Sequence, residues 1–176
     1  KIHSANQRSL KAFLSSRIVV DRSTPTMTSM VMNAARYRQL LHERAANHSA
    51  DIVITEIDKE RLRNLIDLEP SADIFELEHE IERAMVVAPG SVSEDVVTMN
   101  SRALLQVNDE EVEVTLVYPE DADEHAGKLS ICSGIGTAIL GYREGDTFNW
   151  RVPNRTCRIR IDKVIYQPEA AGDFHL

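Results

Sequence analysis

The alternation of apolar and polar residues becomes regular at about residue 51 and first predicts a strand and a helix. Ile52 to Ile54 form a short apolar run that predicts a strand. Thr55, with Asp58 three residues later, resembles a capping box and predicts that a helix opens there and runs over about Glu56 to Leu68. Proline disfavours helical geometry in the residue before it, so Glu69-Pro70 ends this helix.

A second helix is predicted over about Asp73 to Val87. Its apolar residues recur at steps of three and four, as in a coiled-coil seam: Ile74, Leu77, Ile81, Ala84 and Ala88. About four residues connect the two helices, so we expect them to fold back as an antiparallel hairpin, a short coiled coil.

Beyond Pro89-Gly90 the period changes from about 3.6 to two, which predicts strands. The runs with this pattern are Val96 to Met99, Ala103 to Val107, Glu111 to Tyr118, Lys128 to Cys132, Thr147 to Val152 and Cys157 to Tyr166. One short helix is predicted over Gly136 to Leu140, with Gly141 placed to end it. The fold class expected is therefore α+β, a helical hairpin followed by a mostly antiparallel sheet.

The chain divides by charge. Residues 1–50 hold eight Lys or Arg and two Asp or Glu, whereas residues 51–176 hold twelve Lys or Arg and twenty-six Asp or Glu. We expect 1–50 to be a basic extension, partly helical or flexible, although its composition also fits an organelle transit peptide. We further expect 51–90 to form the short strand and helical hairpin, and 91–176 the sheet domain. So acidic a body lacks the clustered cations that strong direct binding of nucleic acid needs.

Composition narrows the class of protein further. The longest apolar run has five residues, whereas a membrane helix needs about 20, so no membrane association is expected. Two cysteines exclude a disulfide scaffold, and without a secretory segment a cytoplasmic location is expected. The histidines and cysteines have no metal-ligand spacing, so the sequence predicts neither a metal site nor a cofactor.

Acidic residues near the hairpin turn form the one constellation suited to chemistry. Asp67, Glu69 and Asp73 could share a Mg²⁺ ion with another macromolecule, because Mg²⁺ takes one or two protein carboxylates. Asp73 also fits as a helix N-cap, which is the preferred interpretation for that residue. Nucleophilic catalysis is not supported, because Cys132 and Cys157 have no histidine nearby in sequence and are expected to be partly buried small hydrophobes.

Several motifs, in order, resemble a known family. The stretch from Gly136 to Asp146 (GTAILGYREGD) is similar to the C-terminal domain of the bacterial Gre transcript-cleavage factors, an FKBP-like fold. More narrowly, three segments resemble the regulator of nucleoside diphosphate kinase family: DVVTMNSR from Asp95, LVYP from Leu116 and YQPEAAGD from Tyr166. The resemblance covers about residues 52–176.

The resemblance implies a non-enzymatic protein that binds RNA polymerase near its secondary channel and modulates elongation in competition with Gre factors. Gre relatives dock through an Asp-Ser-Pro loop, whose matching positions here are Cys132, Ser133 and Gly134, so only Ser133 agrees. Their coiled coil is long and carries two tip acids to the polymerase metal. A first helix of about 13 residues spans only about 20 Å. The tip acids are therefore expected to act through charge and not in transcript cleavage.

Two other functions stay open on the sequence alone. The FKBP-like fold raises prolyl isomerase activity, which needs aromatic side chains around an open cleft, but fold alone does not confer function. The aromatic residues of the C-terminal domain are Tyr118, Tyr142, Phe148, Trp150, Tyr166 and Phe174. Alternatively, the protein is an interaction module that acts on nucleoside diphosphate kinase or another protein partner without binding RNA polymerase. An indirect effect on the kinase through transcription would give the same phenotype.

Overall fold

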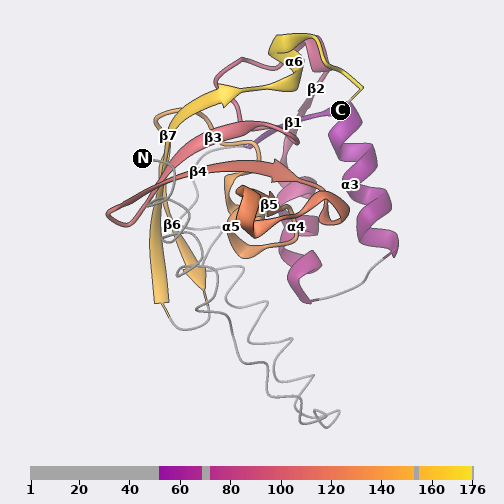
Figure 1. Cartoon of the computed structure of the whole chain (residues 1–176). Coiled ribbons are helices and arrows are strands. Elements are labelled where there is room, and N and C mark those ends of the chain that lie inside the picture. Colours follow the sequence, from indigo (N-terminus) through magenta and orange to yellow (C-terminus); the bar gives the residue numbers. More distant parts are fainter. Residues whose placement is uncertain (1–51, 69–71, 153–154, 176) are drawn as a thin grey trace, which may run out of the picture. The chain divides into compact units, whose positions relative to one another are not determined.

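A helical hairpin and a five-stranded sheet make up the part of the chain that the computed structural model describes, residues 52–68, 72–152 and 155–175 (Figure 1). The basic extension expected over residues 1–50 lies outside the described residues. The domain limits at residues 50 and 90 therefore stay predictions.

The hairpin is enclosed by two short parallel strands. The order is β1 (Val53–Thr55), α3 (Glu56–Leu68), α4 (Ala72–Arg83) and β2 (Met85–Val87). β1 pairs with β2 in parallel, which requires a long crossover connection, and the two helices provide it. α3 has the bounds that the sequence predicts. Its start is capped by Thr55, whose Oγ1 accepts a hydrogen bond of 3.0 Å from the Asp58 N–H.

The predicted end of the second helix is wrong. α4 ends at Arg83 instead of continuing to Val87, and Met85–Val87 is a strand. The Met85 N–H donates to the Ile52 carbonyl at 2.8 Å, so the backbone of this segment forms hydrogen bonds with the β1 segment instead of the hydrogen bonds of a helix. The two valines of β2 also favour an extended backbone. The predicted helical seam is therefore present at Ile74, Leu77 and Ile81, and it ends before Ala84.

The sheet has the strand order β5-β4-β3-β7-β6. Its strands are β3 (Arg102–Val107), β4 (Glu110–Val117), β5 (Lys128–Ser130), β6 (Thr147–Val152) and β7 (Arg155–Tyr166). The β4–β5 pair is parallel and the other pairs are antiparallel, so the sheet is mixed and mostly antiparallel as predicted. The strand predicted at Val96 to Met99 is wrong, because only an isolated bridge from Val96 to Arg143 forms there.

Short helical segments connect the strands. They are η1 (Pro89–Ser91), η2 (Pro119–Asp121), η3 (Glu124–Ala126), α5 (Gly134–Ile139) and α6 (Pro168–Ala171). α5 is the predicted short helix, and it begins two residues earlier than expected because Ser133 caps it. Gly141 follows with φ of +77°, the left-handed geometry expected where a helix ends.

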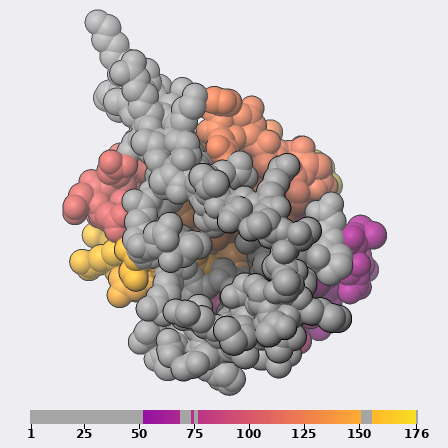
Figure 2. All heavy atoms as spheres, turned by 90° about the horizontal axis from the view of Figure 1, so that it is seen from below, coloured from indigo at the N-terminus to yellow at the C-terminus, as the bar shows by residue number. Residues whose placement is uncertain are grey.

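One continuous core joins the hairpin to the sheet. The buried residues Leu62, Leu77 and Ile81 of the two helices belong to the same cluster as the sheet residues Leu105 and Ile159. Removing a side chain of this size from such a core costs about 2–5 kcal/mol, so the cluster holds the hairpin firmly on the sheet domain. The space-filling view shows the atoms of α3 and those of β7 on opposite sides (Figure 2).

Candidate functional site

The predicted acidic tip is described only in part. Asp67 is exposed in the last turn of α3, and the neighbouring Leu68 has 79% of its surface exposed. Glu69 lies outside the described residues. Asp73 belongs to the first turn of α4, but its side chain also lies outside the described part of the structure. Because α4 begins at Ala72, Asp73 lies inside the helix, and its predicted role as N-cap is wrong. The shared Mg²⁺ site stays a prediction.

The predicted docking loop leads from β5 into α5. The Ser133 hydroxyl is used inside the loop, since it donates to the Ser130 carbonyl at 2.7 Å and accepts from the Gly136 N–H at 3.0 Å. Cys132 and Ser133 are half-buried, and Gly134 is exposed. The exposed surface of these three residues is therefore centred on Gly134, and the hydrogen bonds of Ser133 fix the shape of the loop.

Gly136 lets the start of α5 pack closely against Ser130 at the end of β5. A Cβ atom at this position would lie 2.0 Å from the Ser130 carbonyl oxygen, which no side chain can occupy. Glycine is therefore required here for close backbone approach. The segment from Ser130 to Gly136 is therefore a tightly packed loop that leads into a helix, which is a structural role.

A buried polar cluster links α3 to the sheet domain and to the C-terminal α6. Asp58 is 3% exposed, and its carboxylate accepts a 3.5 Å bond from the Met99 N–H. Thr98 donates to the Glu169 carboxylate at 2.7 Å and lies 2.9 Å from the Ser101 hydroxyl. Two carboxylates therefore approach one another inside the junction.

This proximity changes the acidity of the cluster. Burial, followed by the negative charge of Glu169, raises the pKa of Asp58 from its ordinary value of 3.8 to about 6, although Thr55, Met99 and Arg61 act in the opposite direction. Burial, followed by the charge of Asp58, also raises the pKa of Tyr118 well above its ordinary value. The sequence identified Asp58 only as a capping residue and missed its burial.

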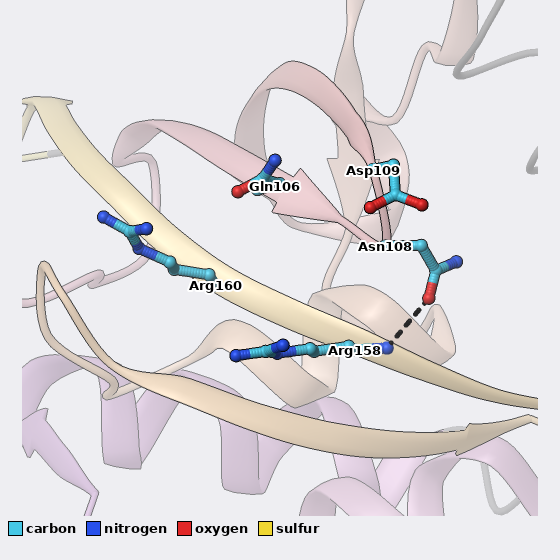
Figure 3. A pocket seen from close by; sticks show the side chains of 5 residues that line it. All are labelled: Gln106, Asn108, Asp109, Arg158 and Arg160. Atoms are coloured by element: carbon cyan, nitrogen blue, oxygen red, sulfur yellow. Dashed lines mark hydrogen bonds between the residues drawn. The ribbon is translucent and has the colours of Figure 1, made fainter.

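A depression on the exposed face of the sheet is the second feature that sequence reasoning missed. It has a volume of about 350 Å³, and its lining side chains are Gln106, Asn108, Asp109, Arg158 and Arg160 (Figure 3). β7 and the β3–β4 turn supply most of them. The signal that could have revealed it is four arginines without an acid between Asp146 and Asp162.

The aromatic residues bear on the isomerase alternative. Tyr142, Phe148 and Trp150 are at most 8% exposed, and the rings of Tyr142 and Phe148 stack with centroids 4.3 Å apart. These side chains fill the core and do not line the depression. Cys157 is also buried, in agreement with its prediction as a small hydrophobe, and Cys132 is half-buried. These three rings therefore do not line the open cleft that an isomerase needs.

The described residues contain neither a cluster of metal ligands nor a helix that could cross a membrane. Within 52–68, 72–152 and 155–175, no three His, Cys, Asp or Glu side chains gather as a metal site would require. Over the same residues, no helix combines the length and the apolar character that crossing a membrane demands.

Comparison with known proteins agrees with this architecture. Residues 92–166 match the family model described as "Transcription elongation factor, GreA/GreB, C-term", and residues 51–87 match the model "Rnk N-terminus". A solved structure, a prokaryotic transcription elongation factor GreA/GreB from Nitrosomonas europaea, is 39% identical with a TM-score of 0.57. The match covers 67% of this chain and all of that one. The class is therefore that of Gre-like factors.

Relatives known by sequence narrow the class to a family. The regulator of nucleoside diphosphate kinase from Escherichia coli is 38% identical over 133 residues, which cover 71% of this chain and 96% of the relative. The transcription elongation factor GreA from a Sulfurovum species is 31% identical, with 81% of each chain covered. The chain belongs to the regulator of nucleoside diphosphate kinase family.

Proposed function

We propose that this protein is a non-enzymatic transcription regulator that binds RNA polymerase near the secondary channel and modulates elongation in competition with Gre factors. The observation that carries the proposal is a combination of two parts. The sheet domain matches the GreA/GreB C-terminal domain, and the hairpin attached to it has helices of only 13 and 12 residues.

In this proposal the two parts have separate roles. The sheet domain docks on the polymerase through the loop at Cys132, Ser133 and Gly134. A helix of 13 residues is about 20 Å long, too short to carry a catalytic metal through a deep channel. The acidic tip then acts by repelling or competing with other anionic groups near the channel entrance, which requires charge but no catalytic geometry.

Competition for core RNA polymerase tests the proposal. The purified full chain is bound to core polymerase at low salt, and a Gre factor is added in increasing amounts. We expect mutually exclusive binding, so that the apparent affinity of each factor for polymerase falls as the concentration of the other factor rises. Absence of polymerase binding would overturn the proposal and favour the alternative, an interaction module that acts on nucleoside diphosphate kinase, which a pull-down with that enzyme would then examine.

Charge reversal separates docking from the effect of the tip. Replacing Asp67, Glu69 and Asp73 with Lys is expected to change the effect on elongation rate while polymerase affinity falls by less than about threefold, because the docking loop is untouched. The matched control reverses Glu56, Glu60 and Glu82, three exposed acids nearer the base of the same hairpin. An equal change in elongation with both variants would contradict a specific role of the tip.

A further inference from the structure

The β6–β7 hairpin departs from the acidic character of the rest of the body. Between Asp146 and Asp162 the chain has four arginines, at positions 151, 155, 158 and 160, and no Asp or Glu. Over residues 51–176 acids outnumber cations by twenty-six to twelve. A concentration of one sign of charge on one element is the condition under which an oppositely charged ligand is attracted locally.

Strand periodicity places two of these arginines on the face of the sheet away from the core. Cys157, Ile159 and Ile161 have no exposed surface, and successive side chains of a strand point to opposite faces. Arg158 and Arg160 alternate with them and are exposed. Two residues along a strand correspond to about 7 Å, so the guanidinium groups rise from neighbouring positions beside one depression (Figure 3).

Asn108 is held at the edge of this depression by the backbone of Arg158. Its side-chain oxygen accepts from the Arg158 N–H at 3.0 Å, and its own N–H donates to the Arg158 carbonyl at 2.7 Å. Asn108 has φ of +57°, a turn conformation that asparagine tolerates. The oxygen of the amide is therefore committed to β7, which leaves its NH₂ group as a donor for a ligand.

The residues that line the depression carry a net positive charge. Arg160 contacts Asp162 through Nε at 3.0 Å, which leaves the two terminal nitrogens of its guanidinium for other acceptors. Arg158 forms no ion pair with any residue in the described part of the chain. Asp109 is the one acid among the five lining residues, so the lining holds two cations and one anion.

We propose that the depression formed by Arg158, Arg160 and Asn108 binds a phosphate group. Guanidinium groups present planar pairs of donors that match phosphate oxygens, and the amide of Asn108 adds a neutral donor. The volume of about 350 Å³ is near the lower end for ligand sites. No aromatic residue belongs to the lining, so base stacking contributes nothing and the phosphate itself is recognised. A nucleotide and an RNA backbone both carry this chemistry.

Nuclear magnetic resonance of the ¹⁵N-labelled full chain tests the proposal with inorganic phosphate as the probe. Phosphate replaces chloride at constant ionic strength, and the Nε–H signals of arginine and the NH₂ signals of asparagine and glutamine are followed. We expect saturable shifts at Arg158, Arg160 and Asn108. Parallel titrations with a nucleoside monophosphate and with a short RNA then identify the source, since affinity that rises with RNA length indicates backbone phosphates.

A double variant and its control decide the outcome. Arg158→Gln with Arg160→Gln is expected to weaken phosphate binding at least about tenfold, because charge-assisted hydrogen bonds are lost. The control, Lys128→Gln with Lys163→Gln, removes the same charge from exposed positions outside the lining and should change affinity less than about twofold. Absence of saturable shifts in the unmodified chain, or equal losses in both double variants, would overturn the proposal. Polymerase binding is not part of the readout, so the two proposals fail independently.

Discussion

Replacing the buried Asp58 with asparagine should stabilise the protein near neutral pH. The carboxyl group lies at the junction of α3, the sheet domain and α6, is 3% exposed and faces the charge of Glu169. The amide introduced by Asp58→Asn would have nearly the same shape and would keep an oxygen to accept the bond from the Met99 N–H. The change therefore removes a buried charge while it preserves the packing and one acceptor.

The magnitude follows from the pKa of Asp58. The pKa rises from 3.8 in the unfolded chain to about 6 in the folded one, a difference of about two pH units at roughly 1.4 kcal/mol each. The folded state holds the proton more tightly, so the free energy of unfolding falls as pH increases from about 4 to about 6, and a penalty of roughly 3 kcal/mol persists above that window. Loss of the favourable interaction between a negative charge and the N-terminal end of α3 offsets about 1 kcal/mol. We expect a net gain of about 2 kcal/mol at pH 7.5.

Urea denaturation at several pH values measures this difference. Trp150, the single tryptophan, is 2% exposed and reports unfolding by fluorescence. The difference between Asp58→Asn and the unmodified chain should be small near pH 4, grow up to about pH 6 and then stay constant. The control Asp67→Asn, an exposed acid on the same helix, should remain within about 0.5 kcal/mol at every pH. Destabilisation by Asp58→Asn at pH 7.5, with no change in the pH profile, would refute the reasoning.

Two glycines give further predictions. Gly141→Ala should cost more than about 3 kcal/mol in urea denaturation, because φ is +77° and the new Cβ would lie 2.7 Å from Ile52 Cβ and 2.9 Å from the Val53 backbone. Gly145→Ala, also at positive φ but with open space, should cost only about 1–2 kcal/mol, and equal losses would contradict the steric argument. Gly134→Pro should raise the unfolding free energy by about 0.5 kcal/mol, because position 134 is the first of α5 and the preceding residue is already extended. The double variant Cys132→Asp with Gly134→Pro has the Asp-Ser-Pro sequence of Gre docking loops, and it should bind polymerase more tightly in a competition assay. Unchanged affinity would speak against docking through this loop.

Local signals in the sequence were sufficient for several elements. Thr55 and the proline after Glu69 predict the bounds of α3, because capping and the restriction before proline act over a few residues. The alternation around Phe148 and Trp150 predicts a strand with a buried face for the same reason. The family resemblance was likewise readable from short motifs in order, and the comparisons confirm it.

The tertiary structure decided what depends on partners far away in the chain. Met85–Val87 continues an apolar helical pattern locally, but its hydrogen bonds to β1 across some thirty residues make it a strand. Val96 to Met99 has residues that favour a strand, but only an isolated bridge from Val96 to Arg143 forms there. Asp58 becomes a buried carboxylate only because Met99 and Glu169 pack against it. The depression exists only because the turn at Asn108 bonds to the backbone of Arg158, fifty residues away. Capping and side-chain periodicity act between near neighbours, whereas strand pairing, burial and the clustering of charges depend on contacts that form only when distant segments meet.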